Sequence, residues 1–122
     1  IAVTAGLTTL EILKELNPYP ELGEKTAWLC EELKKAAETA GIQIQTQSIG
    51  GMFGYFFSEN KVFNFQDALN SDTGKFTNFF QNMLKEGIYL PPSPFESLFI
   101  STAHSERDLE KTASAFRKSL ND

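Results

Sequence analysis

Residues 42–58 constrain the fold most, because two stretches with the periodicity of β-strands meet there at a pair of glycines. Residues 42–48 alternate apolar and polar side chains, which is the pattern of a half-exposed strand. Residues 52–58 are rich in aromatic side chains, which favour strands. Gly50 and Gly51 predict a tight corner between the two, because glycine adopts backbone conformations that other residues avoid. The stretch therefore predicts two strands of a small sheet.

The aromatic strand has two different faces. Phe53, Tyr55 and Phe57 share one face, and Gly54 lies on the other, where we expect it to leave room for a close neighbour. The glycine spacing matches neither the G-x-G-x-x-G fingerprint of dinucleotide-binding folds nor a P-loop. We therefore interpret this stretch as structural and not as a phosphate-binding loop.

The rest of the chain is mainly helical in its periodicity. Apolar residues recur at helical spacing in four segments, which are 2–16, 22–40, 73–86 and 105–120. Pro18 is expected to end the first helix, because a proline disfavours the helical conformation of the residue before it. Asp72 is expected to cap the third helix, and Ser105 with Asp108 to form a capping-box-like pair at the fourth.

Two further short strands are predicted at 88–90 and 95–101, separated by the rigid link "PPSP", whereas 59–72 reads as a loop with at most a short helical turn. The predicted order is α-α-β-β-α-β-β-α. Strands in pairs with helices between them indicate an α+β fold, with a small, mostly antiparallel sheet and helices packed on one face.

Composition narrows the class of function. With 122 residues the chain is one domain at most, and its net charge of −5 argues against nucleic acid as a partner. No apolar run approaches the ~20 residues of a membrane span, and we see no signal peptide. One cysteine and one histidine make a structural zinc site a poor expectation, so we predict no metal. The start at Ile1, within an apparent helix, suggests a piece of something longer.

Glu96 is the most unusual residue, because it is the only charged side chain between Ile88 and Ala103. A carboxylate in an apolar stretch must face water, find a donor or belong to a site. Two interpretations are equally weighted. Glu96 lies either on the outward face of an alternating strand, with Phe95 inward, or in a functional cleft.

Other candidate residues favour structural roles. His104 lies between a strand and a helix, where a capping or packing contact is favoured over catalysis, because nothing nearby completes a dyad. Cys30 is interpreted as a small buried apolar residue, and a serine nucleophile is not supported. The lysines fall on polar helix faces or in a loop, so none is placed like a desolvated Schiff-base lysine.

Three stretches resemble a known family. They are "GGMFGYFF" (50–57), "FTNFFQNMLKEGIYLPPSPFES" (76–97) and "FISTAHSERDLEKT" (99–112). They look like the C-terminal part of the glutamate-1-semialdehyde 2,1-aminomutase family, which belongs to the class III aminotransferases with fold-type I architecture. The opening "AVTAGLTTLEIL" is similar to the long helix that follows the family's S-G-N-P segment. The family commonly has Ala-Gly where Ser97 and Leu98 stand, and Leu98 adds bulk there.

The resemblance implies how the chain is divided into domains and where the cofactor site lies. Residues 1–17 would be a connecting helix from a missing large domain, and residues 18–122 the C-terminal small domain. The Schiff-base lysine and the groups that bind pyridoxal 5'-phosphate or pyridoxamine 5'-phosphate would lie upstream of this chain. No catalytic, cofactor-binding or metal-binding residue is therefore expected within it, and the chain alone should be inactive.

The resemblance also implies an activity and partners for the parent protein. That activity is the conversion of glutamate-1-semialdehyde to 5-aminolevulinate in tetrapyrrole biosynthesis. The partners would be the remainder of the same subunit and a second subunit in a homodimer, without nucleic acid, membrane or metal. The expected location is cytoplasmic, or the plastid stroma in a photosynthetic eukaryote. Glu96 would be the substrate-proximal residue, which holds or polarises the substrate and disfavours a second substrate carboxylate.

Two other functions stay open at this point. An independent interaction or ligand-binding α+β domain would be favoured by exposed aromatic side chains at Phe53 or Phe57. A small hydrolase would require a serine within hydrogen-bond reach of His104.

Overall fold

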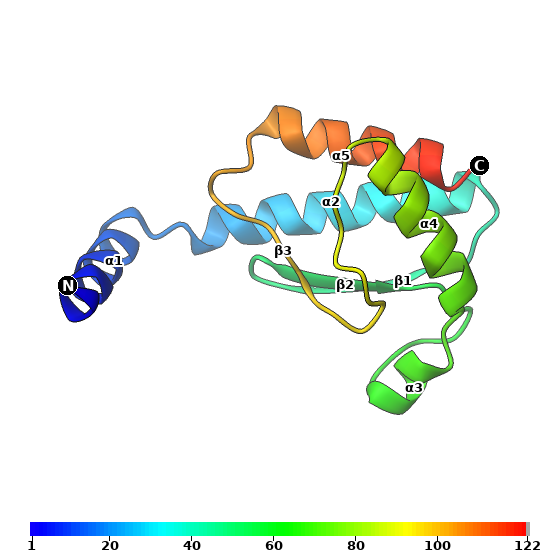
Figure 1. The fold of residues 1–122 in the computed structure, drawn as a ribbon, viewed down its shortest axis with the longest axis horizontal. Helices are drawn as coiled ribbons and strands as arrows, with labels where there is room; N and C mark the ends of the chain where they lie inside the picture. Colours follow the sequence, from blue (N-terminus) through cyan, green and yellow to red (C-terminus); the bar gives the residue numbers. More distant parts are fainter. Residues whose placement is uncertain (122) are drawn as a thin grey trace.

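The structure, a computed structural model, describes residues 1–121. In chain order its elements are α1 (Ala2–Leu16), α2 (Tyr19–Thr39), β1 (Gln45–Ile49), β2 (Met52–Phe56), α3 (Phe65–Leu69), α4 (Thr73–Lys85), β3 (Leu98–Phe99) and α5 (Glu106–Ser119). Figure 1 shows α2 and α5 running side by side next to the sheet, whereas α1 stands apart at the N-terminal end.

The three strands form one antiparallel sheet with β2 in the middle. Ile49 pairs with Met52, so Gly50 and Gly51 make the two-residue corner that the sequence predicts. Gly50 has a φ of 53°, a conformation that costs glycine little. The two strands and their corner are confirmed, although both strands are shorter than expected.

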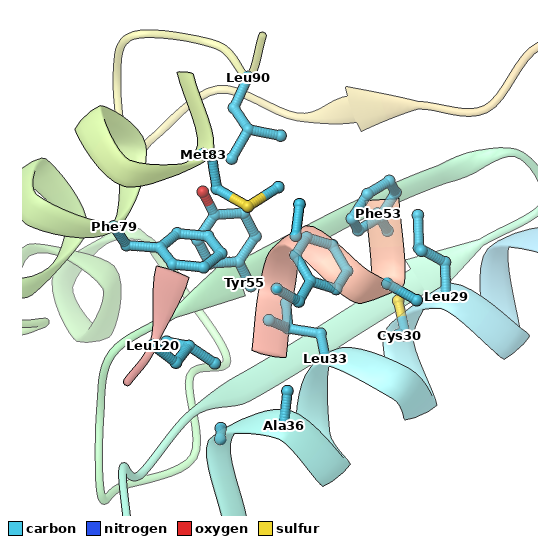
Figure 2. Packing of buried hydrophobic residues seen from close by; sticks show 14 of the residues in the cluster. Leu29, Cys30, Leu33, Ala36, Phe53, Tyr55, Phe79, Met83, Leu90 and Leu120 are labelled. Atoms are coloured by element: carbon cyan, nitrogen blue, oxygen red, sulfur yellow. The ribbon is translucent and has the colours of Figure 1, made fainter. Parts of the chain in front are cut away.

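The core lies between one face of this sheet and α2, α4 and α5. Phe53, Tyr55 and Phe57 are each only 4% exposed and point toward these helices. Figure 2 shows Phe79 and Met83 of α4 beside Tyr55, with Leu29 and Leu33 of α2 below Phe53. The predicted α+β class, with helices packed on one face of a small antiparallel sheet, is confirmed.

The caps predicted at Asp72 and at Ser105 with Asp108 both form. The Asp72 side chain accepts a hydrogen bond from the Lys75 N–H, and Ser105 and Asp108 form a reciprocal capping box at α5. Gly41 and Gly87 end α2 and α4 with φ values of 67° and 77°. α2 begins three residues earlier than predicted, at Tyr19, because a proline is tolerated in the first turn of a helix.

The prediction of two strands at 88–90 and 95–101 is largely wrong. Residues 88–90 form no strand, and only Leu98 and Phe99 of the segment 95–101 pair with β2. Pro91, Pro92 and Pro94 lack the N–H groups that a strand ladder needs. The segment therefore forms a loop with a turn in it, and it joins the sheet only at Leu98 and Phe99.

The close approach expected at Gly54 is found at Gly51 instead. A Cβ added at Gly51 would lie 3.1 Å from the carbonyl oxygen of Ile100, whose N–H donates to the Gly51 carbonyl at 2.8 Å. A Cβ at Gly54 would meet nothing closer than the Phe56 ring, at 3.9 Å. Gly51, not Gly54, is thus the glycine that another segment of the described chain approaches closely, at the residue that follows β3.

The helix α1 forms over the predicted residues, and Asn17 ends it in a left-handed conformation with a φ of 40°. No residue of α1 is buried. Its apolar stripe faces solvent, with Val3 77%, Leu7 58% and Leu10 64% exposed. This helix therefore adds nothing to the core described above.

Candidate functional site

The segment between α4 and α5 carries Glu96 and passes beside the sheet edge. Leu90 anchors its beginning, because this side chain is 5% exposed and belongs to the core. Ile100 anchors its end through the hydrogen bond to Gly51. Between these anchors, the prolines hold a projecting loop over residues 91–97.

A turn at the tip of this loop places Glu96. The Glu96 N–H donates to the Ser93 carbonyl at 3.3 Å, and the Phe95 N–H donates to the Ser93 hydroxyl oxygen at 3.2 Å. Phe95 is not inward, as one prediction had it, but 43% exposed, and its ring packs edge-on against Phe65 of α3 at 5.8 Å between centroids. The turn is therefore fixed by local bonds and one aromatic contact.

Glu96 itself is exposed. Among the described residues 1–121, none forms an ion pair or a side-chain hydrogen bond with its carboxylate. The carboxylate thus projects from the domain on an ordered turn, free to meet a group outside it. Glu96 lies in a turn and not on an alternating strand, so the strand interpretation of this residue is wrong.

His104 has the structural role that the sequence favoured. Its Nδ1 accepts a hydrogen bond from the Ser101 N–H at 3.0 Å, and its own backbone N–H donates to the Ser101 carbonyl, also at 3.0 Å. Lys25 of α2 donates to the His104 carbonyl at 3.2 Å. These contacts close the turn between β3 and α5 and tie it to α2. No serine hydroxyl in the described residues bonds to the imidazole, so the hydrolase alternative has no support.

A cavity of about 240 Å³ lies between this segment and the helices. Its wall is mainly apolar and includes Leu29, Phe53 and Leu98, with His104 and Asp108 at its polar side. Asp108 is engaged by Ser105, whose side-chain hydrogen bond lowers the pKa of that carboxyl. Glu96 does not line the cavity. Leu98, the departure from the family pattern, is partly buried and adds its bulk to the wall of this cavity.

The lysines of the described residues do not supply a pyridoxal-phosphate site. Lys25, with a side chain 18% exposed, is held by Glu21 at 2.6 Å. The side chains of Lys34, Lys35 and Lys118 are 46%, 68% and 60% exposed and pair with neighbouring glutamates. None is a desolvated, unpaired amine of the kind that forms a Schiff base. The cofactor does not fit this chain on its own.

The remaining reactive groups are buried or engaged. Cys30 is 4% exposed, and burial raises the pKa of its thiol, as a packing role predicts. Residues 1–121 contain no group of acidic, cysteine and histidine side chains that could hold a metal ion. Among the same residues, no helix has both the length and the apolar character that crossing a membrane requires.

Sequence reasoning missed two features. Lys25 bridges α2 to the turn at His104, although the two residues are far apart in the sequence and no local pattern links them. Tyr55 is buried with a hydroxyl that has no hydrogen-bond partner in the described residues, and burial raises its pKa. Its period-two position predicts the burial, but only the packing shows the unpaired hydroxyl.

Solved structures that share this arrangement include a transaminase and a protein in its PLP internal aldimine form. An omega-transaminase from Sphaerobacter thermophilus matches 97% of the chain with a TM-score of 0.78 at 19% identity, and the match spans 27% of that protein. The FumI protein of a Sphingopyxis species, in its PLP internal aldimine form, matches 95% with a TM-score of 0.73 at 25% identity and spans 25% of that protein. The fold is that of a small domain in fold-type I aminotransferases.

Sequence relatives are more specific. The chain is 50% identical over 112 residues to a glutamate-1-semialdehyde 2,1-aminomutase of a Sulfurihydrogenibium species, a match of 92% of the chain and 26% of that protein. It is 45% identical to the aminomutases of Chlorobaculum parvum and Campylobacter fetus, over 94% and 98% of its length. No family model matches the chain. The resemblance seen in the motifs is confirmed, and the chain spans about a quarter of these relatives' length.

Proposed function

We propose that this chain is the C-terminal small domain, with its connecting helix, of a subunit that converts glutamate-1-semialdehyde to 5-aminolevulinate. The observation that carries this proposal is the identity of 45–50% over 92–98% of the chain with proteins named for that reaction. Identity of this extent over one domain is hard to reconcile with an unrelated role. The aminomutase is an isomerase, and its product leads to tetrapyrroles.

In this proposal the cofactor belongs to the longer protein. Pyridoxal phosphate, or its amine form, would be bound by residues outside the chain and would supply the electron sink that moves nitrogen between neighbouring carbons. This agrees with the exposed or ion-paired lysines of the described residues. The chain alone is accordingly proposed to be inactive.

The proposed domain division follows the shape of the molecule. Residues 1–17 would be the connecting helix, because α1 stands away from the core and none of its residues is buried. Residues 18–122 would be the small domain, whose described part has its own core. The partners would be the rest of the subunit and a second subunit, and the bacterial relatives support a cytoplasmic enzyme.

Within the small domain, Glu96 is the residue proposed to meet the substrate. It projects on an ordered turn and its carboxylate is unengaged by the described residues. A carboxylate at this place could accept a hydrogen bond from the substrate or a polar neighbour. It would also repel a second substrate carboxylate, such as that of glutamate.

A chimera tests the function. Residues 1–121 would replace the matching quarter of the Sulfurihydrogenibium aminomutase, and formation of 5-aminolevulinate from glutamate-1-semialdehyde would be measured with added pyridoxal phosphate. Activity within about tenfold of the intact relative is expected. A folded, cofactor-loaded chimera without turnover would contradict the proposal.

Glu96→Gln in this chimera tests the substrate-proximal role. The expected loss is about 10–100-fold in kcat/KM, with a rise in the relative use of glutamate as an amino donor, because the repelling charge is gone. Glu59→Gln is the control, since that residue is also an exposed glutamate but lies in another loop. Unchanged rate and unchanged substrate preference in the Glu96 variant would contradict the role.

The interaction-domain alternative loses its main support. Exposed side chains at Phe53 or Phe57 would have favoured it, but both side chains are 4% exposed. The aromatic face of β2 is therefore fully occupied by the domain core.

A further inference from the structure

The face of the sheet opposite the helices is apolar and uncovered. In an antiparallel pair, residues that face each other point to the same side. Met52 and its partners Ile49 and Phe99 therefore point away from the side that Phe53 buries. Ile49 is 73%, Met52 37% and Phe99 68% exposed. Water thus contacts apolar side chains from all three strands on this side.

Three aromatic rings extend the same surface beyond the end of the sheet. Phe63 and Phe65, at α3, are 79% and 66% exposed, and Phe95, on the turn that carries Glu96, is 43% exposed. Phe65 and Phe95 contact each other edge to face. We name the combined surface the open face; it comprises Gln47, Ile49, Met52, Gly54, Phe56, Phe63, Phe65, Phe95 and Phe99.

Two adjoining hollows shape the open face. One, of about 310 Å³, has Gly54, Met52 and Ser97 in its wall. The other, of about 190 Å³, is lined by Phe63, Phe65, Phe95 and neighbours. Gln47 and Phe56 line both. Within residues 1–121, no charged residue lines either hollow. Apolar hollows of this kind accommodate anchoring side chains at protein interfaces.

Gly54 is unexplained by the domain itself. It lies in the middle of β2, where a glycine weakens a strand by leaving nothing to pack. A Cβ there would meet only the Phe56 ring, at the ordinary distance of 3.9 Å. Packing within the domain therefore allows a larger residue. A glycine at such a place in a strand is explained when another chain segment approaches closely from outside.

Charge distinguishes the two sides of the domain. The ion pairs found within residues 1–121 all lie on α2, α4 and α5 or at their ends, such as Lys35 with Glu32 and Lys118 with Glu86. The helix layer therefore has the charged surface that faces water, whereas the described part of the open face lacks charge in its hollows. This difference in charge favours the open face, and not the helix layer, as the side of the domain that is buried in a larger protein.

The relatives indicate what covers that side. About three quarters of the Sulfurihydrogenibium protein lies outside the match to this chain. We propose that the open face is where the remainder of the longer subunit packs, and that one of its apolar side chains fills the notch at Gly54. The inference rests on the proposed function only in taking the chain to be part of such a subunit. It also places the Glu96 turn at the rim of that interface, through Phe95.

Thiol reactivity in the chimera tests the proposal without any measurement of activity. Single cysteines would be introduced by Ile49→Cys and Phe99→Cys on the open face and by Leu84→Cys on α4, in a background whose other exposed cysteines are replaced. Leu84 is the matched control, because it is also apolar and 44% exposed but lies on the helix side. The native Cys30 is buried and does not interfere.

The expected result is that the thiols of Ile49→Cys and Phe99→Cys react at least about tenfold more slowly than the thiol of Leu84→Cys in the folded chimera. Equal rates in all three variants would overturn the proposal. Slow open-face reaction that becomes fast on dilution would also overturn it, because a second copy of the chain would then be the cover. The same substitutions at the aligned positions of the Sulfurihydrogenibium protein decide the question if the chimera does not fold.

A second pair of variants tests the notch. Adding Gly54→Leu to the Ile49→Cys chimera should speed the reaction of the introduced thiol by at least about fivefold, because the larger side chain displaces whatever enters the notch. Gly23→Leu is the control, since a Cβ at Gly23 meets nothing within 4 Å and this glycine lies on α2, away from the open face. Equal rates with and without Gly54→Leu would contradict the notch.

These outcomes separate the two proposals. If the chimera forms 5-aminolevulinate but the thiols on its open face react fast, the proposed function is supported and the proposed interface is overturned. If the chimera folds, binds cofactor and has a protected open face but makes no product, the proposed interface is supported and the proposed function is overturned.

Discussion

The helices α1 and α5 carry apolar stripes of the same periodicity, but only the stripe of α5 is buried. In α5, Leu109, Ala113 and Phe116 are buried in the core, whereas no residue of α1 is buried. The difference shows that periodicity predicts which face of a helix is apolar and suited to packing. It does not show which other segment packs against that face. For α5 the partner is within the described residues, and for α1 we propose that it is in the rest of the subunit.

The largest effect should come from the buried stripe. Phe116 is 1% exposed and packs beside Phe79, with 6.0 Å between ring centroids. Phe116→Ala should lower the free energy of unfolding by about 3–5 kcal/mol, because it removes a large side chain and leaves a cavity. Chemical denaturation followed by circular dichroism measures this. A loss below about 1 kcal/mol would contradict the burial of the α5 stripe.

A smaller effect is expected at the start of the same helix. Ser105 caps α5 by accepting from the Asp108 N–H, so Ser105→Ala should cost about 1 kcal/mol of unfolding free energy. Ser114→Ala makes the same chemical change inside the helix and should be neutral or slightly stabilising, because alanine favours helices. Equal losses for the two variants would show that the cap does not contribute.

The capping box should also make α5 sensitive to acid. Hydrogen bonds from Ser105 lower the pKa of Asp108 below its ordinary value. A carboxyl whose folded pKa is lowered stabilises the fold above its unfolded pKa, and that contribution disappears as the pH falls through the folded pKa. NMR of the Ser105 amide between pH 7 and pH 2 should show the change only below about pH 4. The change should vanish in Asp108→Asn, and a transition above that pH would contradict the assignment.

The smallest effect is expected in α1, which has neither a side-chain cap nor an acidic first turn. Leu7→Ala should change the unfolding free energy of this chain by no more than about 0.5 kcal/mol, because Leu7 is 58% exposed. Thermal melting of the two proteins side by side measures this. A loss that approaches the effect of Phe116→Ala would mean that α1 packs on the core after all.

Local chemistry explains which elements could be predicted. Caps such as Asp72, stops such as Gly41 and the alternation of Phe53 and Tyr55 act through near neighbours, so the sequence reveals them. The prediction of the late strands fails because periodicity does not show whether a stretch pairs with another strand, and Pro91 and its neighbours lack the N–H donors that pairing needs. The close approach at Gly51 depends on Ile100, far along the chain.

The candidate site is predictable to a smaller degree. Glu96 stands out in the sequence because its neighbours are uncharged, but its place on a turn depends on Ser93 and on the contact of Phe95 with Phe65. Its role remains a prediction, because the groups that it is proposed to meet belong to the remainder of the subunit. The bridge from Lys25 to His104 has no sequence signal.

Amide hydrogen exchange along α1 tests most directly the central claim that this chain is one domain of a longer subunit. Exchange at Leu7 and Leu10 would be compared in this chain and in the chimera, with amides of α5 as the internal reference. The account predicts that the α1 amides exchange at least about tenfold more slowly in the chimera, while those of α5 change little. Equally fast exchange of α1 in both proteins would contradict the claim.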